Sequence, residues 1–305
     1  MALNDYVTTF GQYLKAKYGE KIYKLSLHAN VTCPNRDGSK GIGGCTFCNN
    51  KSFFPNHMNA NASISEQIEC NVVQLQKKTQ AKKFLAYFQA YSNTYGDIEY
   101  LKKIYVESLK PDCVIGLCVG TRPDCISNDV LNLLQKIKDL GFEVWIELGL
   151  QSAHDVTLER VNRGHTFVEY QDAVRRIKNA KINLCTHLIA GLPGENKSMI
   201  LDSWQQVLNE GVQGIKWHPL HIVKGTQLAR QWRQGEYQPI TQEDYIDIVS
   251  DALAATPAEV IVHRAMSTVA QKQLLLAPHW TENRWPIMTG IEAKLAQAKQ
   301  LKTSA

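Results

Sequence analysis

Short runs of apolar residues recur along the chain and alternate with longer amphipathic segments. This alternation is typical of a parallel sheet whose strands are joined by crossover helices. Most runs are nearly continuous in their hydrophobicity, as expected for strands that are covered on both faces. The predicted strands are 23–28, 84–90, 113–119, 143–150, 183–190 and 214–220, with a weaker seventh at 259–263.

Six or seven such strand–helix units fit an incomplete barrel better than an open dinucleotide-binding sheet. Helices are expected over 65–78 and from about Ile98, between the early strands. The sequence therefore predicts an α/β fold, a partial (β/α)6 TIM-type barrel with a helical C-terminal extension. The predicted parts are an N-terminal lead (1–19), the barrel (20–265) and the extension (266–305), which Thr281 to Trp285 interrupts.

A glycine-rich loop after the first predicted strand contains three cysteines. Cys45 and Cys48 are separated by two residues, and Cys33 precedes Cys45 by a further eleven. Iron–sulfur clusters are held by thiolates, usually four of them, so three would leave one iron of a cubane free to bind a reacting molecule. In barrels of this kind the reactive groups lie at the carboxyl ends of the strands, which is where this loop begins.

The loop by itself also allows other interpretations. Zinc with a fourth ligand from His28 or His57 would make a structural site. A redox pair of Cys45 and Cys48 would leave Cys33 without a role. Structural thiols with no metal are the third alternative. Small buried hydrophobic residues are expected at the remaining cysteines: Cys70, Cys113, Cys118, Cys125 and Cys185.

Composition narrows the class of protein. The chain has 305 residues, 44% of them hydrophobic and 21% charged, which is ordinary for a globular protein. Its net charge of +5 permits an acidic or nucleic-acid partner without requiring one. The first residues do not resemble a signal peptide, and no apolar run approaches the roughly 18 residues of a membrane span. We expect a cytoplasmic protein with no membrane contact and with reduced or metal-bound cysteines.

Further motifs follow the later predicted strands. They read ELGLQS at 147–152, NRGH at 162–165, GLPGE at 191–195 and HPLH at 218–221. Together with the cysteine spacing, these motifs resemble the radical S-adenosylmethionine superfamily over roughly residues 20 to 230. The resemblance is strongest to the branch that includes the Elongator catalytic subunit and the oxygen-independent coproporphyrinogen oxidases. Within that branch it is strongest to the YhcC-like group of short bacterial proteins.

The resemblance implies a [4Fe–4S] cluster on Cys33, Cys45 and Cys48, whose fourth iron chelates the amino and carboxylate groups of S-adenosylmethionine. Reductive cleavage of that cofactor would give a 5′-deoxyadenosyl radical that abstracts hydrogen from an unidentified substrate. A reductant such as flavodoxin or ferredoxin is implied as a partner. Elongator-like relatives act on transfer RNA, so the resemblance makes RNA a candidate substrate by analogy. Against this enzyme stands a zinc-stabilised basic binding protein without catalysis.

The resemblance also assigns residues to the cofactor. Glu147, Gln151 and Ser152 would contact its ribose and methionine, and Arg163 would pair with the methionine carboxylate. Gly191 would lie near the adenine. Each position has a structural alternative as well: a strand-end hydrogen bond, a solvated arginine at a helix end, and a strand-to-helix turn.

Two segments depart from the superfamily pattern. After the second strand, Tyr87-Phe-Gln-Ala-Tyr91-Ser-Asn-Thr-Tyr95 replaces the usual Gly-Gly-Glu turn that binds the methionine amine. Gly120 stands where relatives have a carboxylate. The amine contact is therefore expected from Gln89 or Glu147, and the three tyrosines face either the substrate or the barrel interior.

A histidine pair follows the sixth predicted strand at the presumed mouth. Proton transfer and simple packing are both open for His218, His221 and the nearby Lys224, so none of them is predicted to be catalytic.

Overall fold

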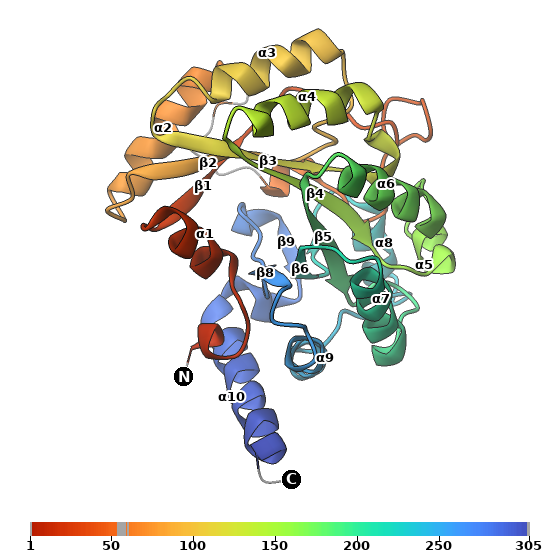
Figure 1. Ribbon diagram of the computed structural model, residues 1–305. Helices are drawn as coiled ribbons and strands as arrows, with labels where there is room; N and C mark the ends of the chain where they lie inside the picture. Colours follow the sequence, from red (N-terminus) through yellow and green to blue (C-terminus); the bar gives the residue numbers. More distant parts are fainter. Residues whose placement is uncertain (1, 54–58, 60, 304–305) are drawn as a thin grey trace.

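A computed structural model describes residues 2–53, 59 and 61–303. Within them, parallel strands form one seven-stranded sheet in the order β1-β2-β3-β4-β5-β6-β8. Figure 1 shows the sheet curving around an interior, with the long helices on its outer side. The predicted partial barrel is therefore confirmed. The strand that was predicted most weakly, 259–263, is also present, as the last strand of the sheet. The strands are β1 (Ile22–Leu27), β2 (Lys83–Phe88), β3 (Val114–Thr121), β4 (Glu143–Gln151), β5 (Asn183–Ala190), β6 (Gly214–Pro219), β7 (Ile222–Val223), β8 (Ile261–Arg264) and β9 (Leu275–Ala277).

Most of the helices begin at a residue whose side chain caps the helix, and several bury one apolar face against the sheet. In α2, for example, Ser63 and Glu66 form a reciprocal capping box, which satisfies backbone N–H groups at the helix start. In α4, the buried side chains Val130, Leu134 and Ile137 follow the helical period. The helices are α1 (Phe10–Tyr18), α2 (Ile64–Gln76), α3 (Ile98–Ser108), α4 (Asn128–Asp139), α5 (Asp155–Arg160), α6 (Phe167–Asn179), α7 (Lys197–Asn209), α8 (Gln227–Arg233), α9 (Gln242–Ala254) and α10 (Arg284–Thr303).

The N-terminal lead contains α1, which packs at the amino-terminal end of the barrel. Phe10 meets Trp145 of β4 edge to face, with 5.4 Å between ring centroids. Glu143, the first residue of β4, accepts hydrogen bonds from the hydroxyl of Tyr18 at 2.7 Å and from the ammonium of Lys17 at 2.6 Å. The lead therefore covers the end of the barrel interior opposite the cysteine loop.

The C-terminal extension is less helical than predicted. Residues 266–283 contain only short 3-10 turns and the strand β9, which pairs antiparallel with β7; the long helix α10 begins at Arg284. Leu275 of β9 is buried with Val223 of β7 and Val269, so tertiary pairing takes the apolar side chains that a helix would have used. In the helix α10, Gly290 approaches Ile246 of α9 so closely that a Cβ would lie 2.6 Å from the isoleucine Cδ1. In the described part of the chain, no helix is long and apolar enough to cross a membrane.

Candidate active site

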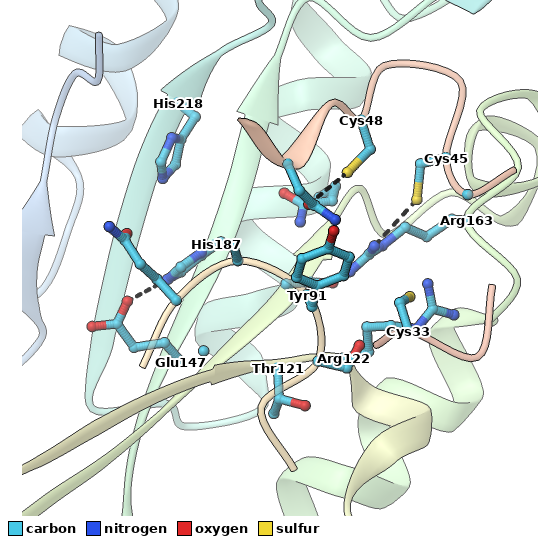
Figure 2. Close-up of a pocket in the computed structure, with 18 of the residues that line it drawn as sticks. Cys33, Cys45, Cys48, Tyr91, Thr121, Arg122, Glu147, Arg163, His187 and His218 are labelled. Atoms are coloured by element: carbon cyan, nitrogen blue, oxygen red, sulfur yellow. Dashed lines mark hydrogen bonds and ion pairs between the residues drawn. The ribbon is translucent and has the colours of Figure 1, made fainter. Parts of the chain in front are cut away.

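A cavity opens at the carboxyl ends of the strands, and the cysteine loop forms one of its walls. Figure 2 shows Cys33, Cys45 and Cys48 at one end of this cavity and Glu147 and His187 toward the other. Gln151, Arg163 and Phe47 also line it, as does His218. The structure therefore brings the three predicted cluster ligands together with three of the five predicted cofactor residues.

The loop owes its course to glycines and to two asparagines. Gly43 and Gly44 have φ values of +84°, a left-handed conformation that favours glycine. The side chain of Asn162 donates to the carbonyl of Gly44 at 2.9 Å, and Asn35 donates in turn to the carbonyl of Asn162. At Gly41 a Cβ would lie 2.4 Å from the Asn35 side-chain oxygen. The glycines thus admit neighbouring protein side chains and set the backbone, so the loop docks on the segment after α5.

The three thiols differ in their surroundings. The Cys45 sulfur accepts a hydrogen bond from Nη1 of Arg163 at 3.3 Å. The Cys48 thiol donates to Oδ1 of Asn50 at 3.3 Å, and Arg36 donates to the Cys48 carbonyl at 2.6 Å. Burial raises the pKa of the Cys48 thiol to about 11, and the neighbouring Cys45 adds to the rise. Thiolate at this position therefore forms when a cation replaces the proton, as in metal binding.

The donor set around the cysteines fits an iron–sulfur cluster and a polar cofactor. Several buried nitrogen atoms at the cavity have no hydrogen-bond partner within the described residues: Nε of Arg163, Nη1 of Arg122, Nδ2 of Asn50 and Nε2 of His218. Buried polar atoms without a partner are rare in folded proteins, so these nitrogens indicate a polar group that binds between them. The three thiols in the same cavity form no disulfide, and thiolates are the ligands that iron–sulfur clusters take.

The zinc interpretation finds little support in the same region. Nδ1 of His28 accepts a hydrogen bond from the backbone N–H of Asn30 at 3.3 Å, and His28 is not part of the cavity wall. His57, the other proposed zinc ligand, lies outside the described residues. Over residues 2–53, 59 and 61–303, no three His, Cys, Asp or Glu side chains converge on one ion position.

Arg163 is buried, so the alternative of a solvated helix-end arginine is wrong. Besides the bond to Cys45, its Nη2 donates to the carbonyl of Gly149. A second arginine, Arg122, donates two hydrogen bonds to the carboxylate of Asp124, at 2.9 and 3.1 Å. Sequence reasoning missed Arg122 and Arg36; their signal was only that each lies in a segment following a predicted strand. These guanidinium groups place positive charge beside the thiols, which would stabilise an anionic cluster bound there.

Glu147 is fully buried in β4 and is surrounded by basic side chains. Its carboxylate pairs with Lys24 of β1, with Lys216 of β6 at 2.7 Å and with Nε2 of His187 at 2.8 Å. Burial alone would raise the pKa of Glu147, but Lys216 and Lys24 outweigh burial and hold that pKa well below its ordinary range. Burial lowers the pKa of Lys216 to about 8, although the negative charge of Glu147 acts to raise it. The partners that a glutamate in an apolar strand requires are thus two lysines, the buried Lys216 and the half-buried Lys24.

The lysines escaped the sequence analysis because each is a single polar residue within an apolar run. Lys24 stands between Tyr23 and Leu25, and Lys216 between Ile215 and Trp217. A lone lysine in a buried strand is itself a signal, since a buried ammonium needs a counter-charge. The inward positions of parallel neighbours in a barrel are where that counter-charge is found.

Two predicted cofactor residues lie away from the cysteine cavity. Ser152 is buried and donates to the Glu195 carboxylate, while its oxygen accepts from the His154 N–H at 3.1 Å. Gly191 lines a different cavity, and its carbonyl accepts from the Tyr237 hydroxyl at 2.6 Å. Gln151, by contrast, lines the cysteine cavity with a φ of +82°, an uncommon value for a residue with a side chain. The cofactor roles of Ser152 and Gly191 stay predictions.

The end of β2 and the segment after it also contribute to the cavity wall. Tyr87, Gln89 and Tyr91 line it, and Tyr91 has a φ of +60°. The Tyr87 hydroxyl accepts a hydrogen bond from Lys216 at 3.0 Å, so this tyrosine belongs to the barrel interior as much as to the cavity. Gly120 faces the same space, where a Cβ would lie 3.2 Å from the Phe88 carbonyl oxygen. Tyr95 is bound instead to the Ser39 hydroxyl, at 2.8 Å.

Comparison with known proteins identifies the class that this fold and site define. Residues 32–206 match the family described as the radical SAM superfamily, and residues 212–297 match a radical SAM C-terminal domain. The chain belongs to the radical SAM superfamily. It is 46% identical to Protein YhcC of Escherichia coli (strain K12) over 97% of this chain and 94% of that protein. The second match crosses residue 265, so the predicted boundary between barrel and extension stays a prediction.

More distant relatives confirm the predicted branch. A tRNA uridine(34) acetyltransferase of Methanocaldococcus jannaschii is 29% identical over 52% of this chain and 29% of its own length. The structure of an N-terminally deleted Elp3 from Methanocaldococcus infernus shares the fold, with a TM-score of 0.65, 19% identity, and coverage of 90% of this chain and 63% of that one. The protein is thus a radical S-adenosylmethionine enzyme whose cofactors are a [4Fe–4S] cluster and S-adenosylmethionine. Membership of the radical SAM superfamily favours the enzyme over the alternative of a zinc-stabilised binding protein.

Proposed function

We propose that Cys33, Cys45 and Cys48 hold the cluster and that S-adenosylmethionine lies in the same cavity beside Gln151 and Arg163. The observation that carries the proposal is the shared cavity, in which three thiols and a buried, incompletely bonded guanidinium meet at the carboxyl ends of the strands. When bound, the cluster supplies the electron that cleaves the sulfonium and generates the 5′-deoxyadenosyl radical.

The chain's own residues hold and shield these groups. Arg163 donates to the Cys45 sulfur, which fixes that ligand and offsets negative charge on the cluster. Phe47 stands in the cavity wall beside the cysteines and excludes water from them. The amino-terminal end of the barrel is filled by Phe10 and Trp145, so access is from the loop side. Glu147 orders Lys24 and Lys216 beneath the cavity, and a contact between its carboxylate and the methionine amine stays a prediction.

Partners and location follow from the chemistry and from the relatives. A one-electron donor such as flavodoxin or ferredoxin is required to reduce the cluster. The relative named a tRNA uridine(34) acetyltransferase supports RNA as a candidate substrate, together with the mildly basic net charge of +5. A reducing, cytoplasmic environment suits eight cysteines that form no disulfide.

The proposed function is tested by purification and assay without oxygen. We expect a brown protein with about four irons and four sulfides per chain. With dithionite or reduced flavodoxin it should convert S-adenosylmethionine into 5′-deoxyadenosine and methionine, quantified by liquid chromatography and mass spectrometry. A colourless protein that carries one zinc, without iron or sulfide, would contradict the proposal. So would a fully loaded cluster that binds the cofactor and never cleaves it.

A further inference from the structure

A second cavity, whose walls include none of the three cysteines, adjoins the cysteine cavity. The two share Phe47, Gln151, His187, His218 and Arg264 in their walls. From there the second cavity runs along the end of β6 and the segment after β8, past His221, Ser267 and Val269. It therefore extends the active site beyond the cavity that we propose for the cluster and S-adenosylmethionine.

Positive charge is in excess where the two cavities join. Lys24 and Lys216 share the single carboxylate of Glu147, and Arg264 brings a third cation. Arg264 forms no hydrogen bond or ion pair through its side chain with any described residue, and it is close enough to Lys216, Tyr87 and His218 to act on each electrostatically. Among the described residues that line the second cavity there is no aspartate or glutamate. Arg264 is exposed, so water solvates its charge, and its guanidinium is available to pair with an anion that enters the cavity.

The second cavity also offers buried hydrogen-bonding atoms without partners. These are Nε2 of His218, Nε2 of His221 and Oγ of Ser267, all without a partner in the described part of the chain. The His221 ring is hydrogen-bonded to the backbone of Ser267. Burial lowers the pKa of His221 to about 4, so at neutral pH the imidazole is uncharged and one of its nitrogens accepts. The cavity thus contains a cation, Arg264, that can bind an anion. It also contains a nitrogen of His221 that can accept a hydrogen bond from an O–H or N–H group.

We propose that this second cavity is the substrate subsite and that Arg264 binds an acidic group of the substrate, a carboxylate or a phosphate. His218 and His221 hydrogen-bond polar groups of the same molecule. The inference rests on the proposed function, because it places the substrate beside the cavity that holds the cofactors. The acidic group belongs either to a free small acid or to a modified nucleotide, and the chemistry that Arg264 recognises is the same.

The experiment measures how fast phenylglyoxal modifies Arg264, read by peptide mass spectrometry on the cluster-loaded protein with S-adenosylmethionine bound. The probes are glutarate, inorganic phosphate and the neutral analogue glutaramide. At ten times its dissociation constant, glutarate or phosphate should slow the modification of Arg264 about tenfold by mass action. Glutaramide should leave the rate unchanged. Arg284, an exposed arginine on α10 outside the site, is the internal control and should react at one rate throughout.

Equal protection by glutarate and glutaramide, or protection by neither acid, would overturn the subsite. Complete protection by S-adenosylmethionine alone would also overturn it, because Arg264 would then serve the cofactor. Protection by bulk transfer RNA alone would assign Arg264 to the RNA backbone and overturn a pocket for a single acidic group. As a second readout, glutarate should raise the melting temperature of the wild type and of Arg264→Lys, and leave that of Arg264→Gln unchanged. Iron content and 5′-deoxyadenosine are measured in parallel, so failure of the proposed function is seen separately.

Discussion

Replacing Cys45 with alanine is expected to remove the iron–sulfur cluster and to lower 5′-deoxyadenosine formation more than about 100-fold. That loss is larger than the loss expected from changing a residue that only hydrogen-bonds a metal ligand. Cys45 is the thiol that Arg163 contacts, and two remaining thiolates cannot hold a cubane stably. The measurements are iron and sulfide per chain after anaerobic reconstitution, followed by the product assay.

The matched control is Cys113→Ala, which removes a thiol just before β3 and outside the cavity wall. It should retain full iron content and full cofactor cleavage. Circular dichroism should show both variants folded, because the Cys45 loop is held by Asn35 and Asn162 as well. Full iron occupancy in Cys45→Ala would show that the cluster has different ligands.

Replacing Glu147 with glutamine is expected to lower the free energy of unfolding by about 3–5 kcal/mol, the usual penalty for removing one partner of a buried ion pair. The variant leaves Lys24 and Lys216 without a counter-charge, and the Lys216 side chain is only 3% exposed. Urea unfolding of the cluster-free protein measures the loss without interference from the cofactors. An unfolding free energy equal to that of the wild type would contradict the charge network.

Glu143→Gln is the control, because Glu143 lies on the same strand but pairs with Lys17, whose side chain is 49% exposed. Its loss should be smaller, about 1–3 kcal/mol from charged hydrogen bonds. The pH dependence has a definite sign. Because the folded pKa of Glu147 lies well below the ordinary 4.5, its contribution is present above pH 4.5 and is lost as the pH falls through the folded value. The difference between wild type and Glu147→Gln should therefore shrink in acid.

The barrel was predictable because its strands are buried on both faces and read as apolar runs. Every predicted strand of the main sheet ends within two residues of the observed one. The cysteine loop was equally visible, since ligand spacing along the chain survives folding. Residues 266–280 were predicted wrongly as helix, because pairing with β7 depends on a strand some fifty residues earlier, which no local pattern reveals.

The interior of the site was predictable only in part. Glu147 was identified because a carboxylate in an apolar strand needs a partner, but its partners lie on β1, β5 and β6. Parallel strands bring such residues together across the barrel, and sequence separation gives no measure of that approach. Arg264 was also missed. It is the last residue of β8, and this strand had the weakest signal in the sequence. Ser152 and Gly191 show the converse, because motif position alone does not say which side of a strand end faces the cavity.

Electron–nuclear double resonance on the reduced protein with labelled S-adenosylmethionine bound measures most directly whether the cluster binds the cofactor. The cofactor carries 17O in its carboxylate or 15N in its amine. We expect a resolved hyperfine coupling between each label and the cluster, because three cysteine ligands would leave one iron open to those groups. A reduced cluster whose spectrum shows no coupling to either label, with cofactor binding verified in the same sample, would contradict this expectation.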